Sequence, residues 1–245
     1  YSVRNLHVDH SGRLWAGTWR DGLNLYDPAI EGFIRYRHDP KDPDSLSTDD
    51  IRSLYGDRSG NLWVGTEKGG LNKLDTETGK FSRYRHDPND PQSLVNDSIL
   101  SIYEDKAGYL WLCTRGGVDR FEPETETFTH YPEDYPLNDF SRIYQDQQGR
   151  FWVSTRKGIG HFNFETSQLI HYNYYSGTNV SNERASSIIG DAHGFLWISS
   201  WGGGIKRFDP ETGTFLGYKN QTGDPYSLSS NNALSLYFDS NGVLW

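Results

Sequence analysis

Short runs of apolar and polar residues recur along the whole chain and have the lengths of β-strands. Residues 51–55 (Ile-Arg-Ser-Leu-Tyr) alternate between apolar and polar side chains, and a second short apolar run follows at 62–66. A third run follows a glycine pair at 69–70, and a fourth follows a Thr-Gly turn at 78–79. No stretch keeps a 3.6-residue apolar period over three turns. The pattern predicts an all-β protein built from antiparallel meanders of four strands.

This four-strand pattern is repeated at intervals of 41 to 48 residues. Its most regular feature is a Leu-Trp or Phe-Trp pair, preceded by Asp-x-x-Gly, a sequence typical of a tight turn. The tryptophans of these pairs are Trp15, Trp63, Trp111, Trp152, Trp197 and Trp245. Repeats of 40 to 50 residues with four strands each are typical of a β-propeller. We therefore expect five complete blades and the first two strands of a sixth.

The repeat also predicts where each blade begins and ends. The expected blades are residues 1–47, 48–95, 96–138, 139–182 and 183–230, with a partial blade at 231–245. Two interpretations of the partial blade remain: a fragment of a larger ring, which we favour, or a five-bladed ring with an unpaired tail. The absence of methionine and the opening on Tyr1 also suggest a piece of a longer protein, whose signal peptide or membrane anchor would lie outside this sequence.

The composition narrows the class of protein further. Only 34% of the residues are hydrophobic, but 15% are aromatic and the net charge is −9, so a packed core is expected rather than disorder. No apolar run approaches the roughly 20 residues that a membrane helix needs, so we expect no direct membrane insertion. The acidic balance, without a stripe of Lys and Arg, argues against nucleic acid as a partner. The single cysteine, Cys113, permits no internal disulfide and is expected to be a buried thiol.

The repeat unit closely resembles the two-component regulator propeller repeat. The resemblance rests on residues 51–66 (Ile-x-Ser-Leu-Tyr-x-Asp-x-x-Gly-x-Leu-Trp-Val-Gly-Thr), on Gly-Gly-Leu-Asn at 69–72 and on His-Asp-Pro-Asn-Asp-Pro-Gln-Ser-Leu at 86–94, and it extends over the whole chain. It implies a propeller in the extracytoplasmic part of a bacterial inner-membrane sensor, with a histidine kinase or diguanylate cyclase as the output. The family has no shared catalytic residues in its propeller. Blades three and four depart from the pattern at 132–136 and 173–181 and are expected to be irregular.

A four-stranded meander places the loops after the second strands and the long inter-blade loops on one face, where binding residues commonly lie. This face combines two tryptophans outside the core pattern with several basic residues, which suits stacking on a sugar ring or a protein hot spot. The candidate ligand-binding residues are Trp19, Arg20, Lys68, Arg115, Arg156 and Trp201. The alternative is that Trp19 and Trp201 cover the edge of a neighbouring blade.

Other motifs favour structural roles. The paired tryptophans are expected in the core, and His38 and His86 occupy one repeat position, so we expect both to be structural. The loop at 39–44 has three aspartates but lacks the ligand spacing of a calcium loop, and the spacing of the histidines gives no metal site. The triple glycine at 202–204 lacks the Lys-Ser/Thr of a phosphate loop. We predict no catalytic residue, no metal and no cofactor.

Three functions are compatible with these patterns. The first is a non-catalytic sensory module that binds an oligosaccharide or another small ligand and acts as a homodimer in the full-length sensor. The second is a propeller enzyme, such as a lyase or a glycan-active protein, and the third is a passive interaction scaffold. We favour the sensory module because of the resemblance.

Overall fold

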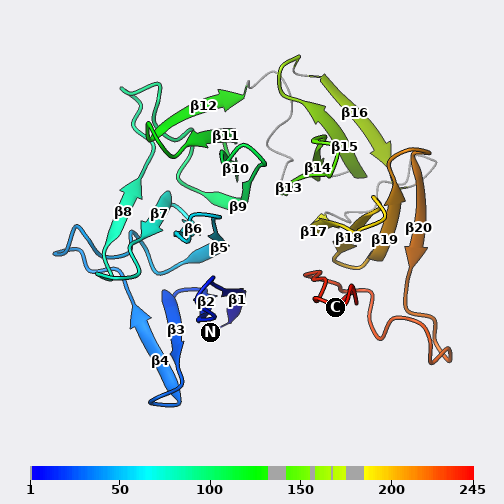
Figure 1. The fold of residues 1–245 in the computed structure, drawn as a ribbon, viewed down its shortest axis with the longest axis horizontal. Coiled ribbons are helices and arrows are strands. Elements are labelled where there is room, and N and C mark those ends of the chain that lie inside the picture. The colour runs from blue at the N-terminus through cyan, green and yellow to red at the C-terminus, as the bar shows by residue number, and fades with distance from the viewer. Residues whose placement is uncertain (1, 132–141, 155–157, 167, 175–184) are drawn as a thin grey trace. The chain divides into compact units, whose positions relative to one another are not determined.

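The computed structural model describes the chain except residues 1, 132–141, 155–157, 167 and 175–184. The described residues form five four-stranded antiparallel sheets and contain no helix (Figure 1). Consequently, no helix in the described part of the chain has the length and apolarity needed to cross a membrane. The predicted fold class, an all-β propeller of four-stranded antiparallel blades, is confirmed.

The chain divides into two compact units, residues 1–138 and 139–245, which we describe separately. Unit 1 contains three blades. Their strands are β1 (Val3–Val8), β2 (Leu14–Thr18), β3 (Leu23–Asp27), β4 (Gly32–Tyr36), β5 (Ile51–Gly56), β6 (Leu62–Thr66), β7 (Leu71–Leu74), β8 (Phe81–Tyr84), β9 (Ile99–Glu104), β10 (Leu110–Thr114), β11 (Gly117–Glu122) and β12 (Thr127–Tyr131). In each blade the strands pair in chain order, and the first strands of successive blades, β1, β5 and β9, contact one another.

Unit 2 contains two further blades and a terminal hairpin. Its strands are β13 (Ile143–Gln145), β14 (Phe151–Ser154), β15 (Gly158–Asn163), β16 (Gln168–Asn173), β17 (Ala185–Gly190), β18 (Leu196–Ser200), β19 (Gly204–Asp209) and β20 (Thr214–Tyr218). Beyond them, Tyr237 and Trp245 exchange two backbone hydrogen bonds of 3.0 and 2.8 Å. This hairpin corresponds to the predicted first two strands of a sixth blade. The predicted irregular segment 132–136 lies outside the described residues, as does most of 173–181.

The core lies between successive blades of each unit. In unit 1 the indole of Trp15 packs on Tyr36, which in turn meets Phe81 of the next blade, and Trp63 meets Phe121 of the blade after that. In unit 2 the indole of Trp152 meets Phe208 in the same way. Burying a large apolar side chain contributes about 1.5–3 kcal/mol. A single blade has no second layer of its own, so its faces are buried only by stacking on a neighbour.

The structure distinguishes two groups among the repeated tryptophans. Trp15, Trp63, Trp111 and Trp152 are at most 3% exposed, as a core role requires. Trp197 is only half-buried and Trp245 is 72% exposed. The difference has a clear cause: the third strand of the next blade supplies the aromatic ring that covers Trp63 and Trp152, and no such strand follows Trp197 in the described part of unit 2.

Each Asp-x-x-Gly turn also anchors its tryptophan. In the turn of the second blade, Gly60 has a φ of 87° and donates its backbone N–H to the carbonyl of Asp57 at 3.0 Å. One carboxylate oxygen of Asp57 accepts the backbone N–H of Asn61, and the other accepts the indole N–H of Trp63 at 2.7 Å. This bond occurs six times, and in each case the indole N–H of Trp at position i+6 donates to the carboxylate of Asp at position i. The turn and the core residue therefore form one unit.

The long inter-blade loops are held by a repeated set of hydrogen bonds. In the first loop, Nδ1 of His38 donates to the carbonyl of Leu46 at 2.8 Å, and the hydroxyl of Ser45 accepts the backbone N–H of Asp39. His86, Leu94 and Ser93 make the equivalent contacts in the second loop. Asp39 and Asp42 accept the backbone N–H groups of Lys41 and Asp44 within the loop, and the carboxylate of Asp44 pairs with Lys80. The expected structural roles of His38 and His86 are confirmed.

Candidate ligand-binding face

The loops between second and third strands are closed by the last residue of the second strand. In unit 1 the hydroxyls of Thr18 and Thr66 each donate to a glycine carbonyl at 2.8 Å, and Thr114 does so at 3.0 Å. Each of these hydroxyls is buried, so the bond also removes an unsatisfied polar group. The residues that follow are thereby held on the surface at a fixed position. We call these loops of unit 1, residues 19–21, 67–69 and 115–116, the loop face.

Two residues of the loop face adopt a backbone conformation that favours glycine. Arg20 has a φ of 74° and Lys68 a φ of 67°, in the left-handed region. In unit 2 the equivalent position is Gly202, with a φ of 74°. A residue with a Cβ atom in this region costs about 1–2 kcal/mol relative to the right-handed one. Blades one and two thus carry a long basic side chain at a left-handed position that is occupied by glycine in unit 2.

The first strands add two arginines to the loop face. In the first and second blades the pairing of the first strand with the second is interrupted by a β-bulge, and the extra residues are Arg4 and Arg52. A bulge re-aims the side chain of its extra residue. Each arginine meets the residue that follows the second strand of its own blade: Arg4 meets Trp19, and Arg52 forms an ion pair with Glu67.

Trp19 is 41% exposed and lies among cations. The guanidinium carbon of Arg4 lies 4.4 Å from the centroid of its ring, and that of Arg20 lies 5.1 Å from it. Cation–π contacts at exposed sites contribute about 0.5–1 kcal/mol each. The two predicted residues Trp19 and Arg20 are therefore brought together, with Arg4 as a third member that the sequence pattern did not indicate.

Glu67 forms ion pairs with arginines from two blades. Its carboxylate pairs with Arg52 and also accepts Nε of Arg115, from the next blade, at 3.1 Å. Burial of Glu67 acts to raise its pKa, but the ion pairs with Arg52 and Arg115 outweigh burial and leave the pKa below its usual value. The predicted site residue Arg115 is thus neutralised by Glu67, although its side chain is 55% exposed.

The other predicted residues have different surroundings. Lys68 is exposed, and its ammonium has no ion-pair partner among the described residues. Trp201, in unit 2, is 63% exposed and is followed by Gly202, whose N–H donates to Oδ1 of Asn232. Arg156 lies outside the described residues. In the described ranges no group of three or more His, Cys, Asp or Glu side chains is arranged to hold a metal ion.

The loop face of unit 1 therefore offers one accessible indole and three cationic groups that have no carboxylate partner among the described residues: Arg4, Arg20 and Lys68. Two carboxylates near these loops are already engaged: Asp21 pairs with Arg37, and Asp97 pairs with Arg85. Such a surface can stack on a sugar ring and can bind an anionic or hydroxyl-rich ligand through charge-assisted hydrogen bonds. Arg4 and Arg52 could have been found from the sequence, because they occupy the same position in two repeats.

The family model of the two-component regulator propeller matches three segments of the chain, residues 45–68, 93–116 and 134–157. These three segments are two-component regulator propeller repeats. The first two matched segments run from the end of an inter-blade loop through two strands and end at Lys68 and Gly116 on the loop face. The matches confirm the resemblance drawn from the sequence.

Solved structures of similar fold include extracellular domains of bacterial sensors. The chain is 26% identical to the extracellular domain described as that of a hybrid two-component system of B. thetaiotaomicron, with a TM-score of 0.65 over 99% of this chain and 38% of that one. A second domain of that organism, described as extracellular and from a one-component system, has 23% identity and a TM-score of 0.63 over 100% of this chain and 40% of that one. The chain thus spans less than half the length of these two solved domains.

An enzyme shares the fold as well. A virginiamycin B lyase of Staphylococcus aureus has 19% identity and a TM-score of 0.67, over 90% of this chain and 71% of the lyase. At this identity the likeness concerns the fold alone. No curated protein matches the chain in sequence.

Proposed function

We propose that this chain is the ligand-binding propeller of a bacterial membrane sensor, that it lies outside the cytoplasm, and that it signals to a histidine kinase output in the same protein. The observation that carries the proposal is the combination of three two-component regulator propeller matches with 26% identity, over 99% of the chain, to the extracellular domain of a hybrid two-component system. A ligand changes the output of such a sensor only if one signalling state binds the ligand better than the other.

The loop face of unit 1 is the proposed ligand site. Trp19 supplies an accessible ring, and Arg4, Arg20 and Lys68 supply donors that no carboxylate neutralises. Sugars are bound in proteins by this combination of an aromatic face with charged or polar donors. We therefore propose an oligosaccharide as the ligand class and a homodimer of the full-length sensor as the signalling form. Arg156 and Trp201 remain predicted contacts.

Calorimetric titration of the purified protein with oligosaccharide mixtures, prepared from neutral and from acidic polysaccharides, tests this proposal. Saturable heat that is lost in Trp19→Ala, with the mixture unchanged by mass spectrometry, supports a non-catalytic site on the loop face. Shortened or unsaturated products would instead indicate a propeller enzyme. Binding that is equally strong in Trp19→Ala would place the ligand elsewhere. Sedimentation of the full-length sensor with and without the bound mixture tests the homodimer.

A further inference from the structure

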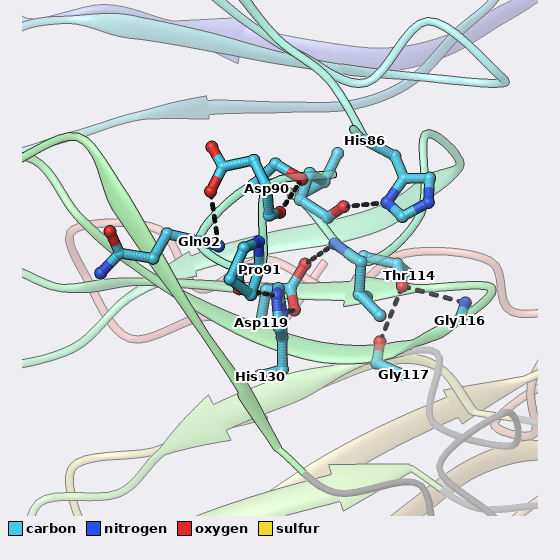
Figure 2. A network of polar contacts seen from close by, with 12 residues as sticks. His86, Asp90, Pro91, Gln92, Thr114, Gly116, Gly117, Asp119 and His130 are labelled. Carbon is cyan, nitrogen blue, oxygen red and sulfur yellow. Dashed lines mark hydrogen bonds and ion pairs between the residues drawn. The ribbon is translucent and has the colours of Figure 1, made fainter. Parts of the chain in front are cut away.

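His130, in the outer strand β12, faces a hydrogen-bond acceptor with each of its two ring nitrogens (Figure 2). Nδ1 lies 2.7 Å from Oδ1 of Asp119 in β11, and Nε2 lies 2.9 Å from the carbonyl oxygen of Pro91. Asp119 is fully buried, and its other oxygen accepts the backbone N–H of Val95 at 2.9 Å. Asp119 and His130 together hold the inter-blade loop 86–97 at two points.

The two acceptors, the carboxylate of Asp119 and the carbonyl of Pro91, determine how many protons the Asp119–His130 pair must hold. A carbonyl oxygen and an ionised carboxylate can only accept, whereas a neutral imidazole carries a single N–H and can donate only once. Both contacts of His130 are satisfied only when the imidazole is protonated, or when the proton resides on Asp119 and is donated to Nδ1. In either case the pair holds one proton more than a neutral histidine beside a carboxylate.

We propose that Asp119 and His130 form a protonation-dependent latch for the loop 86–97. With the additional proton bound, His130 joins Asp119 to the carbonyl of Pro91. When that proton leaves, the remaining N–H stays with the buried carboxylate, because a hydrogen bond to a charged acceptor is the stronger one. Nε2 then presents a lone pair to the oxygen of Pro91, and this contact is lost.

The surroundings of the pair favour the protonated form near neutral pH. The hydrogen bond that the ring donates to Asp119 raises the pKa of His130 above 6.5, in opposition to partial burial of the ring. Burial raises the pKa of Asp119, while the hydrogen bonds from His130 and Val95 and the nearby ring of His86 lower it. Both net shifts make the folded protein bind protons more tightly than the unfolded chain. The stabilisation from His130 is complete below about pH 6.5 and is lost as the pH rises through its folded pKa. The contribution of Asp119 is complete only below about pH 3.8, its unfolded value, and is lost as the pH rises through the folded pKa of Asp119.

The second blade contains the same latch in a form that does not titrate. Asn72 and Arg83 occupy the strand positions of Asp119 and His130, and the amide oxygen of Asn72 accepts the backbone N–H of Ser47 at 2.9 Å. Arg83 donates to the carbonyls of Ser45 and Asp42 at 2.8 and 3.0 Å. An amide carries no ionisable proton and a guanidinium keeps its charge in proteins. The second blade therefore holds its loop independently of pH.

The latched loop leads to the loop face. Ser98, just beyond it, accepts the backbone N–H of Arg115 at 3.1 Å and contacts Glu67 at 3.5 Å. Asp97 accepts the N–H of Gly70 at 2.8 Å. Release of the loop at Pro91 is thus expected to loosen the support of Arg115 and Glu67. That consequence for ligand binding rests on the proposed function, whereas the latch itself does not.

Two measurements on the purified protein test the latch. In an NMR titration of the ring nitrogens, His130 is expected to have both nitrogens protonated at low pH and a titration midpoint above 6.5. His38 and His86 are internal references, since each ring has one carbonyl contact. In urea unfolding, the wild-type midpoint is expected to fall as the pH rises through the His130 transition. The double variant Asp119→Asn, His130→Arg, which copies the second blade, is expected to lose that shift.

The reverse exchange, Asn72→Asp with Arg83→His, is expected to add a second pH-dependent shift of similar size. A His130 midpoint at or below 6.5 would overturn the latch. A double variant Asp119→Asn, His130→Arg with the full wild-type pH dependence would overturn it as well, whatever ligand the loop face binds.

Discussion

The indole N–H of Trp63 donates a 2.7 Å hydrogen bond to the carboxylate of Asp57, six residues earlier, across the turn that joins β5 and β6. Asp57 is 5% exposed and Trp63 is 1% exposed, so neither group can exchange this bond for one with water. The bond connects the turn to the core between the blades. It is present in every repeat, so each blade has the same link between its first turn and its repeated tryptophan.

Asp57→Ala is expected to destabilise the protein by about 2–4 kcal/mol, because it leaves the buried indole N–H of Trp63 and the N–H of Asn61 without an acceptor. Urea unfolding measures the change. Asp239→Ala is the matched control: it removes the same bond to Trp245, which is 72% exposed, and is expected to cost less than about 1 kcal/mol. Equal losses in the two variants would contradict a role that depends on burial.

The turn carboxylates also predict a loss of stability in acid. Burial of Asp146 acts to raise its pKa, but hydrogen bonds from Trp152 and Arg150 outweigh burial and lower the pKa below 3.8. A depressed folded pKa means that the stabilisation is complete above about pH 3.8 and is lost as the pH falls through the folded value. Unfolding free energies measured between about pH 5 and pH 2 are expected to fall less steeply in Asp146→Asn. An unchanged slope would show that other carboxylates govern the acid transition.

Trp19→Ala is expected to weaken ligand binding while the fold is retained. The ring is 41% exposed, and its removal is expected to cost about 0.5–2 kcal/mol, the value of its contacts with Arg4 and Arg20. Trp201→Ala is predicted to behave similarly. Trp63→Ala, a core truncation, is expected to cost about 3–5 kcal/mol by comparison. If Trp19→Ala and Trp201→Ala unfold the protein in the same calorimetric scan, the two tryptophans are core residues and the proposed site fails.

Lys68→Gly is expected to stabilise the protein by up to about 1 kcal/mol, because glycine adopts the left-handed conformation without the steric cost of a Cβ atom. The greater entropy of glycine in the unfolded chain offsets part of this gain. Lys68→Ala removes the same charge but keeps the conformational cost. Thermal unfolding separates the two variants, and titration with an acidic oligosaccharide mixture compares their affinities. Equally weakened binding in both variants identifies the lysine charge as the functional element. Unchanged binding in both would remove Lys68 from the site.

The candidate site was only partly predictable. The repeat indicated that Trp19 and Arg20 share a loop, because both follow the end of the second strand of the same blade. The shared repeat position of Arg4 and Arg52 is visible in the sequence, but the direction of the Arg4 side chain is not, because the β-bulge that re-aims it has no clear signature in a single sequence. The sequence also indicated that the Arg115 guanidinium is available to a ligand. In the structure Glu67 of the preceding blade, 48 positions earlier in the chain, neutralises it.

The sequence alone determined the four-stranded blades, their turns and the class of the repeat. These follow from local patterns: alternation specifies strands, and Asp-x-x-Gly specifies a turn with Gly at positive φ, as at Gly60. Tertiary structure decided which polar groups meet, since hydrogen bonds and ion pairs depend on atoms brought together from different blades. Asp119, His130 and the carbonyl of Pro91 are unremarkable as separate residues in the sequence. Only the stacking of one blade's loop on the next blade's outer strands places two acceptors around one imidazole.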